Sequence, residues 1–197
     1  MYNLNDKFPD KYFKSLKESS KDTEKEDFMV ENDFIVLKLD DYNKEEFQKE
    51  MKASMCLKGG DACFECNDIL YIIEFKNRYL RKNVVFEVLE KMYASSIVIM
   101  DKLNIDIHEF RKNVKFVTVY TFDEVCDEKT LYEEQINIPH KGLTRIKMGI
   151  SSKSTKKIKN IDEKAFTLKK LEKNLYNEVC AIPVNYFQRF LKEENII

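Results

Sequence analysis

The stretch GGDACFECNDILYIIEFKN, residues 59–77, decides the fold. After its two glycines, the segments DACFEC and ILYIIEFK are rich in residues that favour β-strands. The polar pair Asn67-Asp68 lies between them, and a two-residue polar connection between apolar runs is typical of a β-hairpin. The stretch therefore predicts two antiparallel strands joined by a tight turn.

This hairpin brings ionisable side chains together. With the polar pair as its loop, Cys63 pairs with Ile72, and Asp61 lies directly opposite Glu74. Opposed side chains of antiparallel strands have Cβ atoms about 4.5–5.5 Å apart, and the two-residue period of a strand puts Lys76 on the same face as Glu74. The sequence alone predicts two carboxylates and one ammonium on a single surface.

Two carboxylates held this close resist joint ionisation unless a cation lies between them. Oxygen donors without His or Cys favour Mg²⁺ or Mn²⁺ over Zn²⁺, and Mg²⁺ needs only one or two protein carboxylates. Such an ion supports phosphodiester hydrolysis, in which Lys76 would orient the attacking water or stabilise the developing negative charge. The alternative is a salt-bridge ladder of Asp61, Glu74 and Lys76 on the solvent side of the sheet. Glu74 favours the metal site because it interrupts the apolar run ILYIIEFK, where an ionised side chain needs a partner.

Apolar periodicity along the rest of the chain predicts an α/β domain. FIVLKL at 34–39 and VKFVTVYTF at 114–122 are apolar runs typical of strands. From 83 to 103, apolar residues recur at three- and four-residue steps, which predicts a long amphipathic helix. The inward positions of this helix would be Val85, Leu89, Met92, Tyr93, Ser96 and Met100. We expect a mixed central β-sheet flanked by helices.

A shorter helix is predicted before the hairpin. Asn43 and Glu46 have the spacing of a capping box, so the helix would start there and run through EEFQKEMKAS. Phe47 and Met51 would then face inward. Pro183 stands at the first position of another predicted helix, VNYFQRFLKE.

The chain divides into a short arm and one domain. Residues 1–30 are predicted to form a polar N-terminal arm with one short helix, whose apolar stripe would be Phe8, Tyr12, Phe13 and Leu16. Residues 31–197 are predicted to form a single domain. Its parts would be a core at about 34–122, a basic loop at about 141–160 and a C-terminal helical region at about 161–197.

Asp61, a gap of thirteen residues and the strand ending IEFKN together resemble the D…(D/E)xK signature of the PD-(D/E)XK nuclease superfamily. The resemblance covers roughly residues 34–122, and Gly60 stands where the full motif has proline. It implies a restriction-endonuclease-like core and cleavage of DNA, or sometimes RNA, with Mg²⁺ or Mn²⁺. Asp61 and Glu74 would be metal ligands and Lys76 the catalytic lysine.

The resemblance also implies a further acidic ligand, because members often supply one from the helix before the hairpin. Glu50 is the candidate, since it shares a helical face with Phe47 and Met51, and Glu46 is its rival. The favoured alternative for either residue is a solvated surface acid. Since some members have lost activity, an inactive nucleic-acid- or protein-binding module is the alternative to a nuclease.

Two basic segments are candidate contacts for a phosphate backbone. Arg78, Arg81 and Lys82 follow the strand that ends at Lys76, where capping and solubility would equally explain them. The run KGLTRIKMGISSKSTKKIKN at 141–160 contains the second set, which includes Lys153, Lys156 and Lys157, or is simply a solvated loop. Nucleic acid, DNA in the first place, is therefore the expected partner. A homodimer would be needed to sever both strands of a duplex at once.

Composition excludes several other classes. The formal net charge of −1 gives no global preference for polyanions, and two histidines leave little room for a His-rich metal centre. No segment approaches the ~18 apolar residues of a membrane span, so we expect a soluble, unexported protein with no membrane partner. Five cysteines at irregular spacing suit reduced thiols in a cytoplasm, and Cys63 and Cys66 would point to opposite faces of their strand.

Overall fold

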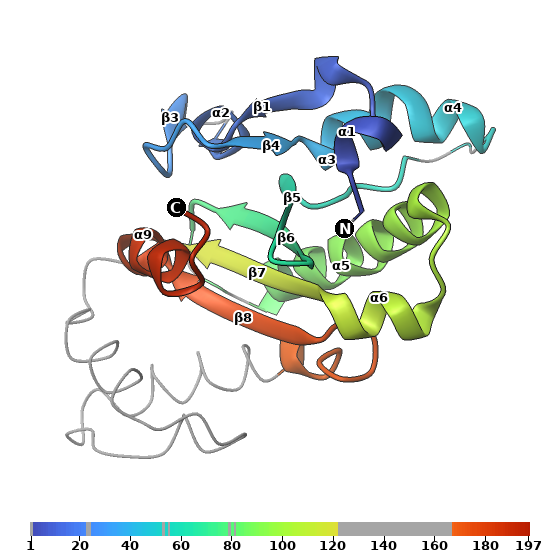
Figure 1. The fold of residues 1–197 in the computed structure, drawn as a ribbon. Coiled ribbons are helices and arrows are strands. Elements are labelled where there is room, and N and C mark those ends of the chain that lie inside the picture. Colours follow the sequence, from blue (N-terminus) through green and yellow to red (C-terminus); the bar gives the residue numbers. More distant parts are fainter. Residues whose placement is uncertain are drawn as a thin grey trace.

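The computed structural model describes residues 2–22, 25–52, 54, 56–78, 80, 82–121 and 167–197. Its centre is a six-stranded mixed sheet in the order β1-β4-β5-β6-β7-β8 (Figure 1). The strands are β1 (Phe13–Ser15), β4 (Ile35–Leu37), β5 (Ala62–Cys66), β6 (Ile69–Lys76), β7 (Val114–Tyr120) and β8 (Glu178–Pro183). A separate ribbon pairs β2 (Lys21–Asp22) with β3 (Asp27–Phe28). The predicted α/β fold with a mixed central sheet is confirmed.

Helices cover both faces of this sheet. They are α1 (Leu4–Lys7), the 3-10 turn η1 (Asp10–Tyr12), α2 (Leu16–Ser19), α3 (Leu39–Tyr42), the π-helical turn η2 (Asn43–Phe47), α4 (Gln48–Glu50), α5 (Lys82–Leu103), α6 (Ile107–Asn113) and α9 (Val184–Glu193). One buried cluster joins α5 and α6 to one face, and a second joins α9 to the other. In the described part of the chain, no helix combines the length and the apolar character that crossing a bilayer requires.

The hairpin forms in the predicted register. Cys63 pairs with Ile72 and Cys66 with Ile69 in the antiparallel ladder of β5 and β6. The two loop residues have φ of 51° and 61°, and positive φ at both central residues is the signature of a type I′ turn, whose twist matches that of the strands. Cys63 and Cys66 belong to different core clusters, so they do face opposite sides of the sheet.

The long helix also forms, as α5, and carries the chain from β6 to the parallel strand β7. It was predicted at 83–103 and spans Lys82–Leu103. Among its predicted inward positions, Met92 is fully buried but Tyr93 is 50% exposed. Val85 and Ser96 are also buried as predicted, and the buried face is wider than predicted, because it includes Val84, Val88 and Ser95 as well.

The N-terminal residues are part of the sheet. The segment that the sequence assigns to a polar arm contributes β1, which pairs antiparallel with β4. Phe8, Tyr12 and Leu16 are buried as expected of an apolar stripe, but they do not share one helix. Phe8 follows α1, Tyr12 belongs to η1 and Leu16 to α2. Pro9 before η1 and the capping box at Ser15 divide the segment into these pieces.

Two further segments differ from the prediction. The helix before the hairpin begins at Leu39, so Asn43 is buried inside it and its side chain donates to the Leu57 carbonyl instead of capping. Met51, expected to face inward, is 56% exposed. In the predicted C-terminal helical region, Glu178–Pro183 form the strand β8, which pairs with β7, and Val184–Glu193 form the predicted helix. The basic loop at 141–160 lies outside the described residues.

Candidate functional site

Glycine and backbone hydrogen bonds hold Asp61 against the end of β6. The Gly60 N–H donates to Ser95 Oγ at 2.9 Å, and a Cβ on Gly60 would lie 2.7 Å from Ile72 Cγ2, so only glycine fits without displacement. The Asp61 N–H donates to the Ile73 carbonyl at 2.9 Å. Asp61 Oδ2 accepts the Phe75 N–H at 2.7 Å. The carboxylate is thereby fixed beside β6, with Oδ1 free of backbone contacts.

A lysine of α5 joins Asp61 to Glu74. Lys91 Nζ lies 2.9 Å from Asp61 Oδ1 and 2.8 Å from Glu74 Oε2. Glu74 projects from β6 toward α5 and is fully buried, and the Lys91 side chain is 14% exposed. The two predicted carboxylates therefore meet, but they meet around an ammonium that belongs to the protein.

The contacts continue outward as an alternating series of charges. Lys76 Nζ lies 3.0 Å from Glu74 Oε1 and 3.2 Å from Glu87 Oε2, and Arg78 pairs with the same oxygen of Glu87. We call this series the charge ladder. Its members are Asp61, Lys91, Glu74, Lys76, Glu87 and Arg78. The exposed fraction of the side chains rises from zero at Glu74 to 50% at Arg78, so the ladder connects a buried acid to the surface.

The ladder sets the ionisation of its members. Burial, with the nearby charge of Asp61, raises the pKa of Glu74 to about 8, against the opposing effect of the two lysines. Burial alone would lower the pKa of Lys91, but the charges of Asp61 and Glu74 and its hydrogen bonds raise it above its usual value. Lys76 and Arg78 overcome the effect of burial on Glu87 and lower its pKa. Lys91 therefore stays charged near neutral pH, whereas Glu74 titrates in that range.

Two buried oxygens at this position lack a hydrogen-bond partner within the described residues. One is Glu74 Oε1, whose 3.0 Å approach to Lys76 Nζ is an ion pair without hydrogen-bond geometry. The other is the hydroxyl of Thr118 on β7, the residue paired with Glu74 in the parallel ladder and therefore beside it on the same face. A buried hydroxyl without a partner is costly, so this corner has polar capacity that the described part of the chain does not use.

These donors fit a hard divalent cation. Asp61 and Glu74 supply carboxylate oxygens that converge on one cationic atom. Glu74 Oε1 and the Thr118 hydroxyl, which lack hydrogen-bond partners among the described residues, suit the water molecules that Mg²⁺ retains. Within the described ranges, no group of three or more His, Cys, Asp or Glu side chains is arranged to hold a metal. The fit is therefore to an ion with two protein carboxylates, at the position that Lys91 Nζ occupies.

The structure does not bring Glu50 to the other two acids. Glu50 is exposed at the end of α4 and pairs with Lys102, eleven residues beyond Lys91 and so about 16 Å along α5. Its rival Glu46 pairs with Lys11 and hydrogen-bonds the Tyr12 hydroxyl. Neither residue is therefore in place to be the expected third acidic ligand, because the helix before the hairpin packs near the far end of α5.

The predicted phosphate contacts are only partly described. Arg78 is exposed at the outer end of the charge ladder, where it pairs with Glu87. Lys82 is the first residue of α5. Arg81, Lys153, Lys156 and Lys157 lie outside the described residues.

Three residues of the site are not among those that the sequence predicts. Lys91 lies on the same stripe of α5 as Val84, Val88 and Ser95, at steps of three and four residues, and that spacing marks it as inward-facing. Glu87 precedes it by one turn. Thr118 lies in the middle of an apolar strand, where its polar group stands out in the same way as that of Glu74.

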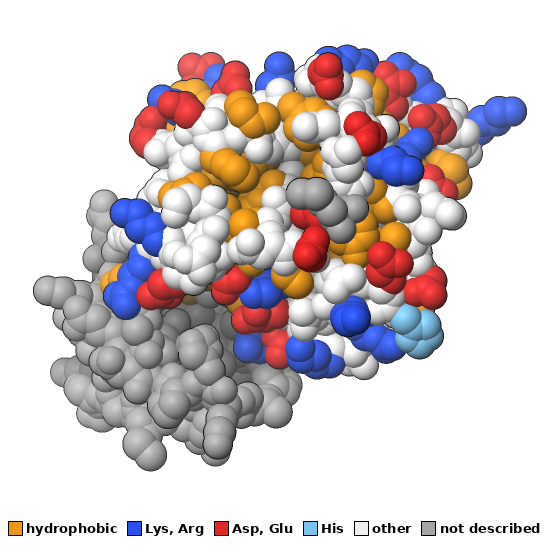
Figure 2. Space-filling view, in the orientation of Figure 1, with side chains coloured by type: hydrophobic (Ala, Val, Ile, Leu, Met, Phe, Trp, Pro, Cys, Tyr) orange, Lys and Arg blue, Asp and Glu red, His pale blue; other side chains and the backbone are white. Residues whose placement is uncertain are grey.

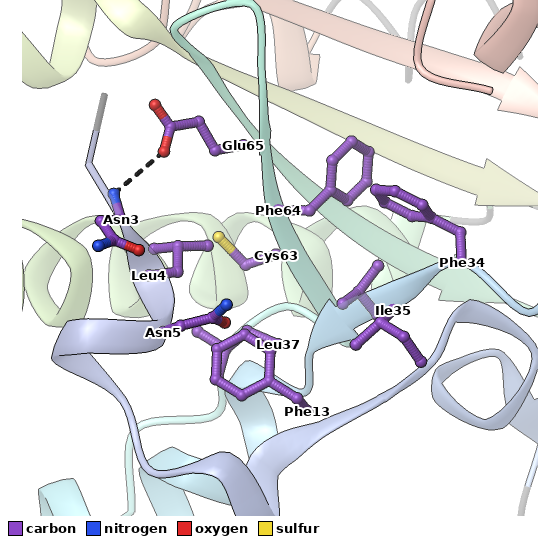
Figure 3. Close-up of a pocket in the computed structure, with 11 residues that line it drawn as sticks. Asn3, Leu4, Asn5, Phe13, Phe34, Ile35, Leu37, Cys63, Phe64 and Glu65 are labelled. Atoms are coloured by element: carbon purple, nitrogen blue, oxygen red, sulfur yellow. Dashed lines mark hydrogen bonds between the residues drawn. The ribbon is translucent and has the colours of Figure 1, made fainter.

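A separate groove of about 260 Å³ lies between the N-terminal segment and β4 and β5. Its lining is mainly apolar and includes Phe13, Phe34, Leu37, Cys63 and Phe64 (Figure 3). On the face of the molecule shown in Figure 2, apolar side chains gather across the middle. At one rim, Glu65 accepts the backbone N–H groups of Tyr2 and Asn3. The groove contains none of the residues of the charge ladder.

Protein-family models, curated proteins and solved structures give no match to this chain. The functional argument therefore depends on Asp61, Glu74 and Lys76, on their place at the end of β6, and on the residues that surround them.

Proposed function

We propose that this protein is a divalent-metal-dependent nuclease of PD-(D/E)XK type that hydrolyses phosphodiester bonds. The observation that supports the proposal most is the convergence of Asp61 and Glu74 on one cationic position, with Lys76 in contact with Glu74. A fully buried glutamate in the middle of a sheet is costly unless it binds a cation, and such acids concentrate at functional sites.

Each residue has a definable task in this reaction. Asp61 and Glu74 would hold Mg²⁺ or Mn²⁺ by one oxygen each, and their backbone and ion-pair contacts fix the carboxylates in advance. The ion, when bound, polarises the phosphoryl group and lowers the pKa of a bound water. Lys76 is 11% exposed and carries a charge that would orient the attacking water or stabilise negative charge as it develops.

The proposed substrate is nucleic acid, with DNA as the first choice. Arg78 is exposed where the charge ladder reaches the surface, so an incoming phosphate would meet a cation before it meets the buried acids. The basic run at 141–160 would add affinity without sequence information. A homodimer would place two such sites on a duplex, and the four described cysteines, all free thiols, suit a cytoplasmic protein.

One observation favours a second function, a nucleic-acid- or protein-binding module without turnover. Lys91 already compensates both carboxylates, so the pair has a cation without any metal. In a binding module, the charge ladder would be a buried ion-pair network that fixes α5 on the sheet.

Cleavage of a mixed panel of single- and double-stranded DNA and RNA, with Mg²⁺, Mn²⁺ or EDTA, tests the nuclease proposal. We expect metal-dependent cleavage that falls about a thousandfold in Glu74→Gln and about a hundredfold in Lys76→Met. Lys115→Met is the matched control, because Lys115 bridges two carboxylates on the opposite face of the sheet, away from the ladder.

The controls decide between the two functions. Circular dichroism and thermal unfolding must show that each variant is folded. Binding of a panel member that persists without cleavage, and is unchanged in both ladder variants, would favour the module and remove the nuclease proposal.

A further inference from the structure

Lys91 occupies the position at which the two acidic groups converge. Its Nζ lies within hydrogen-bond distance of Asp61 Oδ1 and Glu74 Oε2. A divalent cation bound by both carboxylates would need this position, since each carboxylate directs one oxygen there. An ammonium and a divalent cation cannot share it, because they would repel each other strongly at that distance.

The charges of the buried ladder are balanced without a metal. Asp61 and Glu74 face Lys91 and Lys76, and farther out Glu87 faces Arg78. A divalent cation added to this set would leave an uncompensated positive charge in a corner that is mostly buried, which is expensive. Binding becomes favourable when the ammonium leaves, or when an anion such as a phosphodiester brings negative charge with it.

We propose that Lys91 is a built-in counter-ion that holds Asp61 and Glu74 in the metal-free protein and competes with divalent metal for them. The inference rests on the proposed metal site at these two carboxylates. Release of the Lys91 side chain would then accompany metal binding, and the released ammonium would be available to a phosphate oxygen of the substrate. Lys91 is a positioning residue in this scheme and takes no part in bond breaking.

Two buried oxygens at the site that lack hydrogen bonds support competition over a purely structural role. A network built only for packing would use its buried polar atoms, but Glu74 Oε1 and the Thr118 hydroxyl have no hydrogen-bond partner in the described chain. Both lie on the α5 face of the sheet beside the Lys91 contact. They would accept or donate hydrogen bonds once a hydrated ion replaced the ammonium.

Isothermal titration with Mn²⁺ alone, in the absence of nucleic acid, tests the inference directly. Lys91→Met keeps the aliphatic stem and removes the charge, and we expect it to bind Mn²⁺ at least about tenfold more tightly than the wild-type protein. Lys102→Met is the matched control, because Lys102 lies on the same helix and pairs with Glu50 away from the site. It should bind Mn²⁺ as the wild type does.

Wild-type protein provides an independent measurement if Lys91→Met does not fold. Lysine acylation by acetic anhydride, read by peptide mass spectrometry, should show Lys91 protected without metal and several-fold more reactive with Mn²⁺, while Lys102 is unchanged. Unchanged reactivity of Lys91, or equal or weaker Mn²⁺ binding by a folded Lys91→Met variant, would overturn the inference.

These results separate the inference from the nuclease proposal. Metal-dependent cleavage by the wild-type protein, with no gain of Mn²⁺ affinity in Lys91→Met, removes the competing role of Lys91 and leaves the nuclease. Tighter Mn²⁺ binding in the variant, without cleavage by any form of the protein, supports the counter-ion and removes the nuclease.

Discussion

The two faces of the central sheet each carry a lysine that bridges two carboxylates. On the α5 face, Lys91 bridges Asp61 and Glu74. On the α9 face, Lys115 of β7 lies 3.2 Å from Glu178 and 2.7 Å from Glu194. The two lysine side chains are almost equally buried, at 14% and 15% exposed. The difference lies in the acids, since Glu74 is fully buried whereas Glu178 is 41% exposed.

The Lys115 network holds parts of the fold together, whereas the Lys91 network contains a buried acid whose charged form is unfavourable. Glu194 also accepts the Tyr71 hydroxyl at 2.6 Å, so the Lys115 network ties the end of the chain to the sheet. Lys115 overcomes the effect of burial and lowers the pKa of Glu178. At Glu74, burial dominates and raises the pKa. The charged form of Glu74 therefore depends more on a neighbouring cation than that of Glu178 does.

The largest contrast is expected when each lysine loses its charge. Lys91→Met leaves a buried glutamate with one lysine contact, and we expect it to lower the free energy of unfolding by about 2–3 kcal/mol. Lys115→Met leaves acids that water can reach, so the loss should be about 1 kcal/mol or less. Urea denaturation in EDTA at neutral pH measures both. Equal losses would mean that Glu74 is no more dependent on its lysine than Glu178 is.

The hairpin, which brings Glu74 to Asp61, could be predicted because the signal is local. Asn67 and Asp68 tolerate the left-handed conformation that a tight turn requires, and the apolar runs on each side fix which residues pair. The long helix and β7 were equally accessible, since their apolar periods extend over many residues. These three elements set the fold around the site.

Lys91 could not be predicted with the same ease, because its burial depends on partners distant in sequence. A lysine on a helix is normally a surface residue, and only the acids contributed by the hairpin make the inward position favourable. Strands β1 and β8 were not predicted for a related reason. Phe13–Ser15 and Glu178–Pro183 are short, and pairing with β4 and β7 determines their conformation more than their own composition does.

The pH dependence of stability should also differ between the Lys91 and Lys115 networks. The pKa of Glu74 is about 8 in the folded protein and about 4.5 without the fold, so the folded state holds a proton that the unfolded chain releases between these values. Wild-type stability should therefore fall steadily, relative to Glu74→Gln, as pH rises from about 5 to about 8.

The matched variant Glu178→Gln should show the opposite dependence. Since the pKa of Glu178 is lowered in the fold, its contribution is present above the unfolded value near 4.5 and is lost as pH falls through the folded value. The difference between wild type and Glu178→Gln should stay constant from about pH 5 to about pH 8. Denaturant titrations at fixed salt measure both series. A Glu74→Gln difference that is also flat would contradict the raised pKa of Glu74.

The smallest effect concerns two hydroxyls. Tyr71→Phe removes the hydrogen bond to Glu194 and should cost about 1 kcal/mol, because a charged acceptor loses its donor. Thr118→Val should cost nothing or stabilise the metal-free protein slightly, because the Thr118 hydroxyl is buried without a hydrogen-bond partner in the described chain. Thermal unfolding in EDTA measures both.

With Mn²⁺ present, Thr118→Val should gain less stability than the wild type if the hydroxyl binds a metal-bound water, whereas Tyr71→Phe should gain as much. A clear loss of stability in Thr118→Val without metal would show that the hydroxyl already has a partner. The two faces of the sheet would then differ only in how their acids are buried.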